Sequence, residues 1–256
     1  MNENNITQII IDTINTILGN LFSSIDNNLY SILDDITFIN SDILKDKKAS
    51  LVLKRIFDIV VSAIMLILLS PVFLILAVVI KSESKGPVFY KQVRLTSYCK
   101  EFKIFKFRTM VQNADKIGAH VTTQRDSRIT KSGAFIRRYR LDEISQLINV
   151  FTGSMTFVGT RPEVPEYVGH YTPEMYATFL LPAGVTSLTS IYYKDEGELL
   201  KNSENPDDTY VNEVMPGKMF YNLKGIEKFS FWGDIKIMFM TFFAMCGKEY
   251  NADIAV

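Results

Sequence analysis

Asp142 and Glu143 are the residues whose types and position most clearly suggest chemistry in this sequence. Two adjacent carboxylates repel each other, yet these two begin an apolar-periodic run directly after a strongly basic part of the chain. At a helix N-terminus the backbone N–H groups and the helix dipole stabilise anions, which predicts a lowered pKa for both carboxyl groups. Successive helical residues point about 100° apart, so one carboxylate could attack phosphorus while the other holds a divalent cation such as Mg²⁺. A helix cap without a catalytic role is the commoner interpretation of such a pair.

A second group of candidate residues is basic and suits phosphate. Arg161 lies in "VGTRP", where Gly159 and Pro162 constrain the backbone and the planar guanidinium can bind phosphate through two hydrogen bonds. Lys106 and Arg108 could neutralise charge in a phosphoryl transfer. The sequence has no G-x-x-x-x-G-K-[ST] loop, no G-x-G-x-x-G and no G-x-S-x-G, so P-loop phosphotransfer, dinucleotide chemistry and the hydrolase elbow lack support.

The distribution of charge favours an anionic partner. The 256 residues carry 28 Lys/Arg and 28 Asp/Glu, but residues 81–140 hold 15 Lys/Arg and only four Asp/Glu, so this block has +11 and the rest of the chain −11. Such a block suits phosphates, nucleic acid or acidic lipid, and a solvated basic surface is the alternative. Two distant cysteines and two histidines argue against a disulfide framework and a thiolate or multi-histidine metal site, and favour a reducing cytoplasm.

Residues 1–45 are predicted to form an amphipathic helical extension and a polar linker. Isoleucine and leucine recur at three- and four-residue steps over residues 6–39, as in a long amphipathic helix. This segment has no Lys or Arg, whereas a helix at a membrane surface normally carries basic residues on its polar face. We therefore expect packing against protein, with a homodimer formed through this helix as the first candidate, and membrane binding as the alternative.

Residues 46–85 are predicted to enter a membrane. Residues 59–80 are free of charge over 22 positions, enough to cross a hydrocarbon layer of about 30 Å. Basic residues flank both ends and favour the cytoplasmic side. Ser70 and Pro71 stand at the centre, where proline removes a backbone donor and kinks the helix. From these residues alone a re-entrant helix and an ordinary tilted span fit equally, and a buried core helix is a third possibility.

Residues 86–256 are expected to form an α+β domain that is mostly helical, with one small β-hairpin. Period-two alternation predicts strands in "GPVFYKQVRL" and "EFKIFKFRTM", whose pairing would gather Arg94, Lys106 and Arg108 on one sheet. Scattered surface basic residues are the alternative. Helices are expected over residues 112–140, around a loop, and over 141–151. The aromatic-rich "FSFWGDIKIMFMTFFAM" predicts an interfacial helix or, equally, a core helix, and its apolar part from Met238 to Met245 is too short to span a membrane.

Five segments, in order, resemble the motifs of the bacterial sugar transferases, which are monotopic phosphoglycosyl transferases. The segments are "KRIFDIVVSAIMLILLSPVFLILAVVIK", "GPVFYKQVRL", "FKIFKFRTM", "RLDEISQLINVFTGSMTFVGTRPEVPEYV" and "FWGDIKIMFMT". The resemblance implies an enzyme at the cytoplasmic face of the bacterial inner membrane. It would move a sugar-1-phosphate from a UDP-sugar to a polyprenyl phosphate, normally undecaprenyl phosphate, release UMP, and start a capsule, exopolysaccharide, O-antigen or glycoprotein glycan. Nucleic acid is not an expected partner, because it does not fit a membrane anchor.

The resemblance also assigns roles to individual residues. Asp142 matches the nucleophile that forms a phosphosugar-aspartyl intermediate in a ping-pong reaction, and Glu143 matches the residue that helps bind Mg²⁺. Lys106 matches the basic residue of "KFRTM", and Arg161 matches the phosphate-binding arginine of "GPRP". Ser70-Pro71 matches the kink of a re-entrant helix, so the resemblance favours re-entry over a span.

The sequence departs from the family pattern in three places. Thr160 replaces the first proline of "GPRP". The chain reads "LPAGVTSL" where the family reads "RPGITG", without the arginine and with Ser187 near the last glycine. "YYKDE", with Lys194 as the nearest base, replaces a later arginine. These departures concern donor-sugar and nucleotide contacts. They leave open a membrane-tethered adaptor whose enzyme domain has decayed, and a lipid phosphatase is a rival enzyme.

Overall fold

The computed structural model describes residues 44–114, 126–193 and 205–250. The predicted amphipathic helix over residues 6–39 and Lys194 lie outside the described residues. Within the described ranges the chain is mostly helical and has two small sheets of two strands each, which agrees with the mostly helical fold predicted from the sequence.

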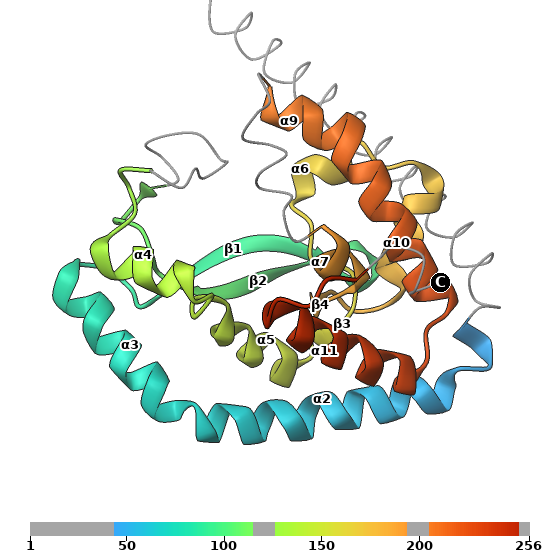
Figure 1. Cartoon of the computed structure of the whole chain (residues 1–256), viewed down its shortest axis with the longest axis horizontal. Coiled ribbons are helices and arrows are strands. Elements are labelled where there is room, and N and C mark those ends of the chain that lie inside the picture. The colour runs from blue at the N-terminus through green and yellow to red at the C-terminus, as the bar shows by residue number, and fades with distance from the viewer. Residues whose placement is uncertain (1–43, 115–125, 194–204, 251–256) are drawn as a thin grey trace, which may run out of the picture.

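A bent pair of helices forms one side of the molecule (Figure 1). Helix α2 (Lys48–Leu68) and helix α3 (Ser70–Glu83) meet at a bend of 59°. Pro71 lies in the first turn of α3, where no intrahelical partner for an N–H is needed. The predicted Ser70-Pro71 kink is therefore confirmed as the place of the bend. Within the described ranges no single helix is long and apolar enough to cross a membrane, whereas the bent pair meets that test of length and composition together.

The bent pair exposes apolar residues on one side and docks on the domain with the other. Large exposed side chains on α2 and α3 include Leu53, Ile56, Ile64, Ile67, Leu68, Leu74, Ile75 and Val78. The docking side of α2 combines apolar side chains such as Phe57 with buried polar contacts. Lys54 donates to Val158 O at 2.6 Å and pairs with Asp234 at 2.5 Å. Asp58 accepts a 2.6 Å hydrogen bond from the Thr156 hydroxyl. The charges at the start of this apolar segment therefore serve as contacts to the domain.

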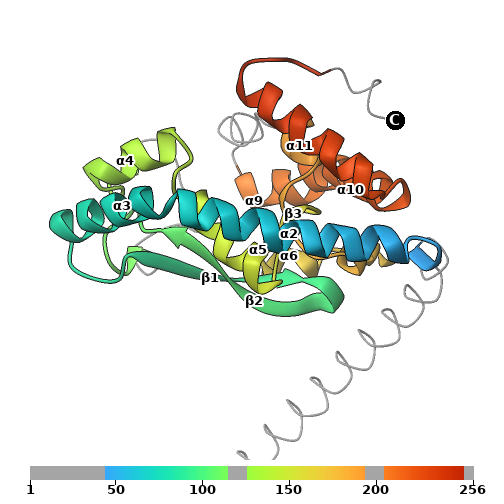
Figure 2. The same ribbon diagram turned by 90° about the horizontal axis from the view of Figure 1, so that it is seen from below.

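A β-hairpin crosses the domain above these helices. Strand β1 (Phe89–Thr96) pairs antiparallel with β2 (Lys100–Phe107) around the short turn η1 (Ser97–Cys99), which confirms the predicted hairpin. The register places Tyr90 opposite Lys106 and Arg94 opposite Phe102, so Arg94 and Lys106 share one face. Figure 2 shows the hairpin on one side of α2 and the helices α10 and α11 on the other.

The predicted position of Arg108 on this sheet is wrong, because β2 ends at Phe107. The Arg108 guanidinium instead donates to Lys85 O at 2.9 Å and Ser84 O at 2.8 Å. Carbonyl groups at a helix C-terminus lack intrahelical partners, and Arg108 supplies hydrogen bonds just past the end of α3. Its buried charge is used by the fold.

The remaining elements surround the hairpin. They are α4 (Lys131–Arg138), η3 (Glu143–Gln146), α5 (Leu147–Thr152), β3 (Thr156–Val158), α6 (Pro165–Val168), η4 (Pro173–Leu180), β4 (Gly184–Thr186), α7 (Leu188–Tyr192), α9 (Pro206–Thr209), η5 (Tyr210–Val214), α10 (Met215–Glu227) and α11 (Phe231–Met245). The predicted helix over residues 112–140 is wrong in extent, since only residues 131–138 of the described part form α4. The predicted helix over residues 141–151 starts instead as a 3₁₀ turn.

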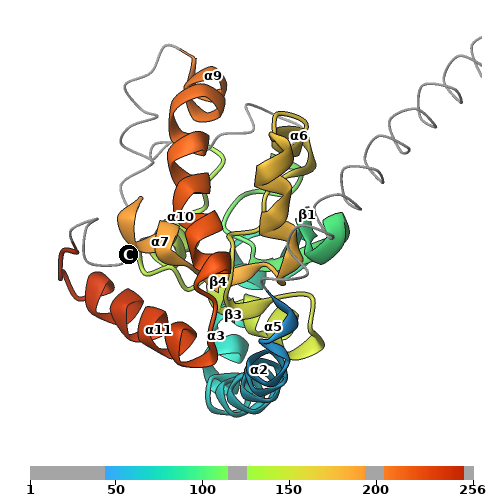
Figure 3. The same ribbon diagram turned by 90° about the vertical axis from the view of Figure 1, so that its right-hand side faces the viewer.

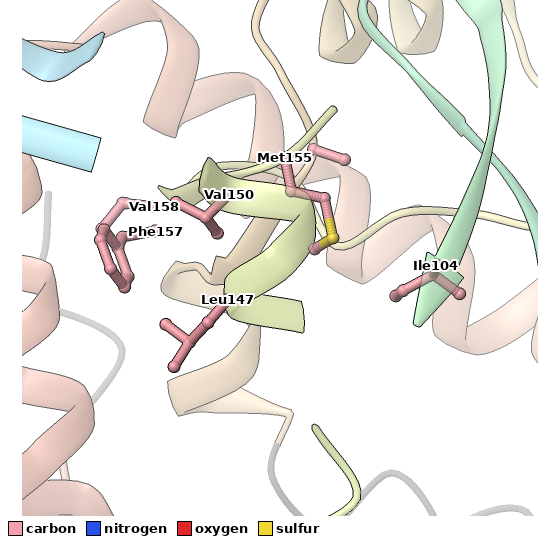
Figure 4. Packing of buried hydrophobic residues seen from close by; sticks show 7 residues of the cluster. Ile104, Leu147, Val150, Met155, Phe157 and Val158 are labelled. Atoms are coloured by element: carbon pink, nitrogen blue, oxygen red, sulfur yellow. The ribbon is translucent and has the colours of Figure 1, made fainter. Parts of the chain in front are cut away.

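The main core lies around α5 and ties it to the hairpin, to the β3–β4 pair and to α2. Its buried members are Ile104, Leu147, Val150, Met155, Phe157, Val158 and Ala183 (Figure 4). Seen along α2, helices α5 and α11 lie on either side of it (Figure 3). Within α11 only Met240 is buried, whereas Trp232, Phe239 and Phe242 are exposed. The other face of α11 packs against the main core through Ile237 and Met238, so this helix combines core contacts with an exposed apolar side.

Candidate active site

The two carboxylates lie in the tight turn between α4 and α5, against the end of β2. Arg140, with φ of 52°, ends α4 in the left-handed conformation, and Leu141 N donates back to Ile136 O at 2.9 Å. Asp142 caps η3, and its carbonyl accepts a 3.0 Å hydrogen bond from Phe107 N. The main chain of Asp142 is thus fixed on the last residue of β2, as a reactive side chain requires.

Two polar residues that the sequence analysis missed hold this turn on the hairpin. Ser145 and Asn149 are buried, and the Ser145 hydroxyl lies 2.9 Å from Phe105 O. The Asn149 side chain accepts from Phe105 N at 2.9 Å and donates to Lys103 O at 2.9 Å. They satisfy the outer edge of β2, which has no third strand. Their spacing of four residues on an otherwise apolar helix face was the available sequence signal.

Glu143 lies among three basic side chains. Its carboxylate is 3.2 Å from Arg161 Nη2, 3.6 Å from Lys106 Nζ and 3.9 Å from Arg140 Nη1. Burial acts to raise the pKa of Glu143, but the charges of Arg161, Lys106 and Arg140 outweigh it and lower that pKa to about 2. The carboxylate therefore stays ionised and holds the cations in place. The structure brings together Glu143, Lys106 and Arg161 as the sequence predicted.

Asp142 differs from its neighbour in its environment. Burial raises its pKa above the ordinary value, and the adjacent charge of Glu143 raises it further, although Lys106 and Arg137 oppose the shift. The expected lowering of both pKa values is thus wrong for Asp142, because desolvation and repulsion exceed the effect of a short 3₁₀ turn. Among the described residues, no other side chain donates a hydrogen bond to the Asp142 carboxylate or pairs with it.

Arg94 lies on the same face of the sheet but serves the neighbouring loop. It donates to Gln92 Oε1 at 2.9 Å and to Pro162 O at 3.1 Å, and it stands 3.8 Å from Glu163. Glu163 also accepts a 2.5 Å hydrogen bond from the hydroxyl of the buried Tyr210. Arg94 therefore anchors the loop that carries Arg161. It supports the site through this loop.

Arg137 is a basic residue beside the site that the sequence analysis did not single out. Its Nε donates to the Thr109 hydroxyl at 2.8 Å. Burial lowers the pKa of Arg137, and the charge of Asp142 acts in the opposite direction, which indicates that the two groups are near each other. Arg137 opens the basic segment "RRYR", which ends shortly before the pair Asp142–Glu143, here called the dyad. This position was the signal available in the sequence.

The dyad suits a magnesium ion that shares its coordination with a substrate. Mg²⁺ is usually held by one or two carboxylates together with substrate phosphates and water. Among the described residues there is no group of three His, Cys, Asp or Glu that could form a complete protein site. The repulsion between Asp142 and Glu143 is the kind that a cation relieves, so the residues present fit such an ion. Asp142 and Glu143 are the side chains that would hold it.

Comparison with known proteins decides the family. The family model for bacterial sugar transferases matches residues 49–248, which includes the bent helix pair, the hairpin and the dyad. The chain belongs to the bacterial sugar transferase family. The matched region contains Lys106, Asp142, Glu143 and Arg161.

Several curated relatives resemble this chain over about two thirds of its length. A UDP-N-acetylgalactosamine-undecaprenyl-phosphate N-acetylgalactosaminephosphotransferase of Aeromonas hydrophila is 34% identical over 169 residues, which are 64% of this chain and 37% of the relative. A UDP-glucose:undecaprenyl-phosphate glucose-1-phosphate transferase of Escherichia coli is 35% identical over 173 residues, 66% of this chain and 34% of the relative. A relative of the same name from Caulobacter vibrioides is 31% identical over 168 residues, 64% of this chain and 59% of the relative. The chain thus spans about a third of the length of the first two.

Proposed function

We propose that this sugar transferase moves a sugar-1-phosphate from a UDP-sugar to undecaprenyl phosphate, releases UMP and so initiates a bacterial glycan. The observation that carries the proposal is the contrast within the dyad. Glu143 is held by Arg161 and Lys106, whereas the Asp142 carboxylate has no side-chain partner among the described residues. The printed names of the relatives, which pair UDP-sugars with undecaprenyl phosphate, support the same substrates.

In the first half-reaction, an oxygen of Asp142 attacks the phosphorus bonded to the sugar. The bond from this phosphorus to the bridging oxygen breaks, UMP leaves with that oxygen, and a phosphosugar-aspartate remains. Main-chain hydrogen bonds at Phe107 hold the nucleophile in place. Arg161 and Lys106 bind the phosphate oxygens and stabilise their charge. When bound, Mg²⁺ would screen the attacking carboxylate from the charge of the phosphates.

In the second half-reaction, an oxygen of undecaprenyl phosphate attacks the same phosphorus. The aspartyl–phosphate bond breaks, Asp142 is restored, and a polyprenyl diphosphate sugar leaves. Arg137 lies on α4 near Asp142, and it is suited to hold the incoming phosphate. Because both attacks occur at phosphorus, the sugar keeps its bond to phosphate throughout.

The bent pair α2–α3 is proposed to enter the inner membrane from the cytoplasmic face and return. Its exposed apolar side supports insertion, and the 59° bend supports re-entry. Helix α11 exposes Trp232, Phe239 and Phe242, which suit the headgroup level of a bilayer. Lys48→Cys and Ser82→Cys, made one at a time in a Cys99→Ala, Cys246→Ser background, test the topology. Re-entry predicts that an impermeant maleimide labels both from the cytoplasmic side, and labelling from opposite sides would indicate a span.

The function is tested with purified full-length protein, undecaprenyl phosphate, Mg²⁺ and a panel of UDP-sugars. We expect UMP release with at least one donor, and loss of that release in Asp142→Asn while the protein stays in the membrane fraction. Release of inorganic phosphate would indicate a lipid phosphatase. No turnover with any donor would favour the adaptor. Unchanged turnover in Asp142→Asn would remove Asp142 from the nucleophile role.

A further inference from the structure

Helices α3 and α4 are joined by a carboxylate that the site described above does not use. Glu83 is the last residue of α3, and its side chain reaches the first turn of α4, 48 residues further along the chain. Its carboxylate accepts hydrogen bonds from Lys131 N at 2.7 Å and Ser132 N at 3.0 Å, and also from the Ser132 hydroxyl. Figures 1 and 2 show α4 beside the end of α3. The contact therefore ties the second arm of the bent pair to α4.

The place of Glu83 in the sequence is explained by α4 and not by α3. An anion near the C-terminus of a helix opposes the helix dipole, so an acidic last residue is unfavourable for α3. At the N-terminus of α4 the same charge is favourable, and the N–H groups of the first turn need acceptors. The Thr130 hydroxyl accepts from Gly133 N at 3.0 Å, and Glu83 accepts from the two N–H groups before it. Glu83 thus completes the cap of a neighbouring helix.

Helix α4 depends on such contacts for its position. It has eight residues, and an isolated helix of this length is marginal in water. Its buried side chain, Ile136, packs with Leu76 and Ile80 of α3, whereas Phe135 on the same helix is exposed. Helix α4 therefore rests on α3 along one side, and Glu83 fixes its first turn there.

The consequence for the site concerns Arg137, which lies on α4 near Asp142. Its Nε donates to the Thr109 hydroxyl at 2.8 Å, and Thr109 O accepts from Thr130 N at 3.0 Å. The Asp142 main chain is instead held by β2, through the 3.0 Å hydrogen bond from Phe107 N. A displacement of α4 would therefore move Arg137 more than it moves the nucleophile.

From these contacts we infer that Glu83 is a positioning residue for the second half-reaction. It fastens α4 to α3 and so holds Arg137 where the phosphate of the acceptor arrives. The inference rests on the proposed function, because it takes Arg137 as the group that receives this phosphate. Helix α3 is an arm of the pair proposed to enter the membrane, so Glu83 is the link through which the anchor sets the position of the acceptor phosphate. A carboxylate with a purely structural role would affect both half-reactions or neither.

The first test compares Glu83→Ala with the matched control Glu227→Ala. Glu227 is likewise exposed and is the last residue of a helix, α10. Two quantities are measured on purified full-length protein with a UDP-sugar that supports wild-type turnover. They are UMP release in a single turnover without acceptor, and the KM for undecaprenyl phosphate.

We expect Glu83→Ala to raise the acceptor KM roughly tenfold, because a displaced binding group loses its alignment with the phosphate. Single-turnover UMP release should equal that of Glu227→Ala. In an Arg137→Ala background, Glu83→Ala should not raise the acceptor KM further, since the group that it positions is already absent.

A second pair of variants removes one hydrogen bond and keeps the carboxylate. Lys131 is the first residue of α4, where proline is favourable, and the preceding Thr130 has the extended backbone that suits a following proline. Lys131→Pro therefore deletes the N–H that donates to Glu83, and Lys131→Ala is its control. We expect a higher acceptor KM for Lys131→Pro than for Lys131→Ala, with equal UMP release. This pair decides the question if Glu83→Ala does not fold, and equal KM values in it overturn the inference.

Three results with Glu83→Ala would also overturn the inference. They are behaviour equal to that of Glu227→Ala, an equal loss in the donor and acceptor half-reactions, and an equal rise of the acceptor KM in the Arg137→Ala background. An unchanged acceptor KM in Arg137→Ala alone would overturn it as well. In each case UMP release by the wild type leaves the proposed function standing, whereas no UMP release by the wild type would overturn both.

Discussion

Two clusters of charged residues in this protein differ in how completely their charges are paired. Around Lys54, the ammonium group has both Asp234 and Val158 O within 2.6 Å, and its side chain is 7% exposed. Around Glu143, the closest pair is 3.2 Å, and the Arg161 side chain is 46% exposed. The first cluster is closed and fastens α2 to the domain. The second has more cations than anions, and within the described part of the chain no side chain pairs with the Asp142 carboxylate. This is the arrangement expected where an anionic substrate completes the site.

The comparison shows that burial alone does not identify a charged residue with a role in function. Lys54, Asp58 and Arg108 are all more buried than Asp142, yet each is held by main-chain or side-chain partners of the fold. A buried ionic group that is fully paired is costly to break but contributes little by itself to function. A partly exposed charged group whose hydrogen-bond and ion-pair partners are incomplete is the better candidate for a functional residue.

Removing Arg161 should have the largest effect on activity with little effect on stability. Arg161→Ala takes away a guanidinium that would bind the reacting phosphate, and we expect kcat/KM for UMP release to fall by about 10²–10³. The free energy of unfolding should change by less than about 1 kcal/mol, because the Arg161 side chain is 46% exposed and Glu143 keeps its contacts with Lys106 and Arg140. Arg161→Lys serves as the control and should recover only part of the activity, since a lysine cannot bind bidentately. A large loss of stability with unchanged kinetics would place Arg161 in the first type of cluster.

Breaking the cluster around Lys54 should have a large effect on the stability of the protein. Lys54→Ala leaves Asp234 buried and unpaired, and we expect a loss of roughly 3–5 kcal/mol of stability. The pKa of Asp234 is already raised by burial, and the Lys54 charge opposes that shift, so its removal should raise the pKa further. The measurement is denaturant unfolding of the membrane-extracted protein in detergent. The paired replacement Lys54→Met with Asp234→Leu should recover most of the loss, and a failure to do so would contradict the pairing.

The pH dependence should separate the two carboxyl groups of the dyad. Asp142 must be ionised to attack, so kcat/KM should fall with decreasing pH through a pKa above the ordinary aspartate value. Lys106 opposes the raised pKa, so Lys106→Met should move this acid limb to higher pH. Glu143, with its pKa of about 2, stays ionised there, and its stabilising contribution is lost only as the pH falls from about 4.5 towards 2. An acid limb that Lys106→Met does not move would argue against Asp142 as the titrating group.

The smallest effect on activity is expected from Tyr210, which supports the loop of Arg161 through Glu163. Tyr210→Phe removes only the hydroxyl that donates to Glu163 at 2.5 Å, and we expect a loss of about 1 kcal/mol of stability. Because Glu163 and Arg94 anchor the loop of Arg161, the KM for the donor should rise a few-fold. In an Arg161→Ala background the same change should leave the donor KM unaltered. An equal rise in both backgrounds would show that Tyr210 does not act through Arg161.

Much of the candidate site could be predicted because its chemistry is local. The adjacent carboxylates, the alternation that places Arg94 and Lys106 on one strand face, and the proline at the bend each follow from neighbouring residues. The apolar periodicity of residues 141–151 likewise predicts that the dyad lies at the start of a helix. For these features, tertiary contacts only refine what the backbone already favours.

The parts that could not be predicted depend on contacts between distant segments. Arg108 has the right spacing for the sheet, but the open carbonyl groups after α3 take its guanidinium. Lys54 is one of the basic residues that flank the apolar segment in the sequence, and only the fold places Asp234 opposite it. The raised pKa of Asp142 depends on burial by the whole domain.

The central claim is that a side-chain oxygen of Asp142 becomes bonded to phosphorus. The direct measurement is mass spectrometry of the protein after rapid mixing with a UDP-sugar and Mg²⁺ in the absence of acceptor, followed by peptide mapping. We predict a mass increment of one sugar phosphate on the peptide that contains Asp142, absent in Asp142→Asn and lost when undecaprenyl phosphate is added. Product formation by the wild type without any such increment at Asp142 would contradict the account.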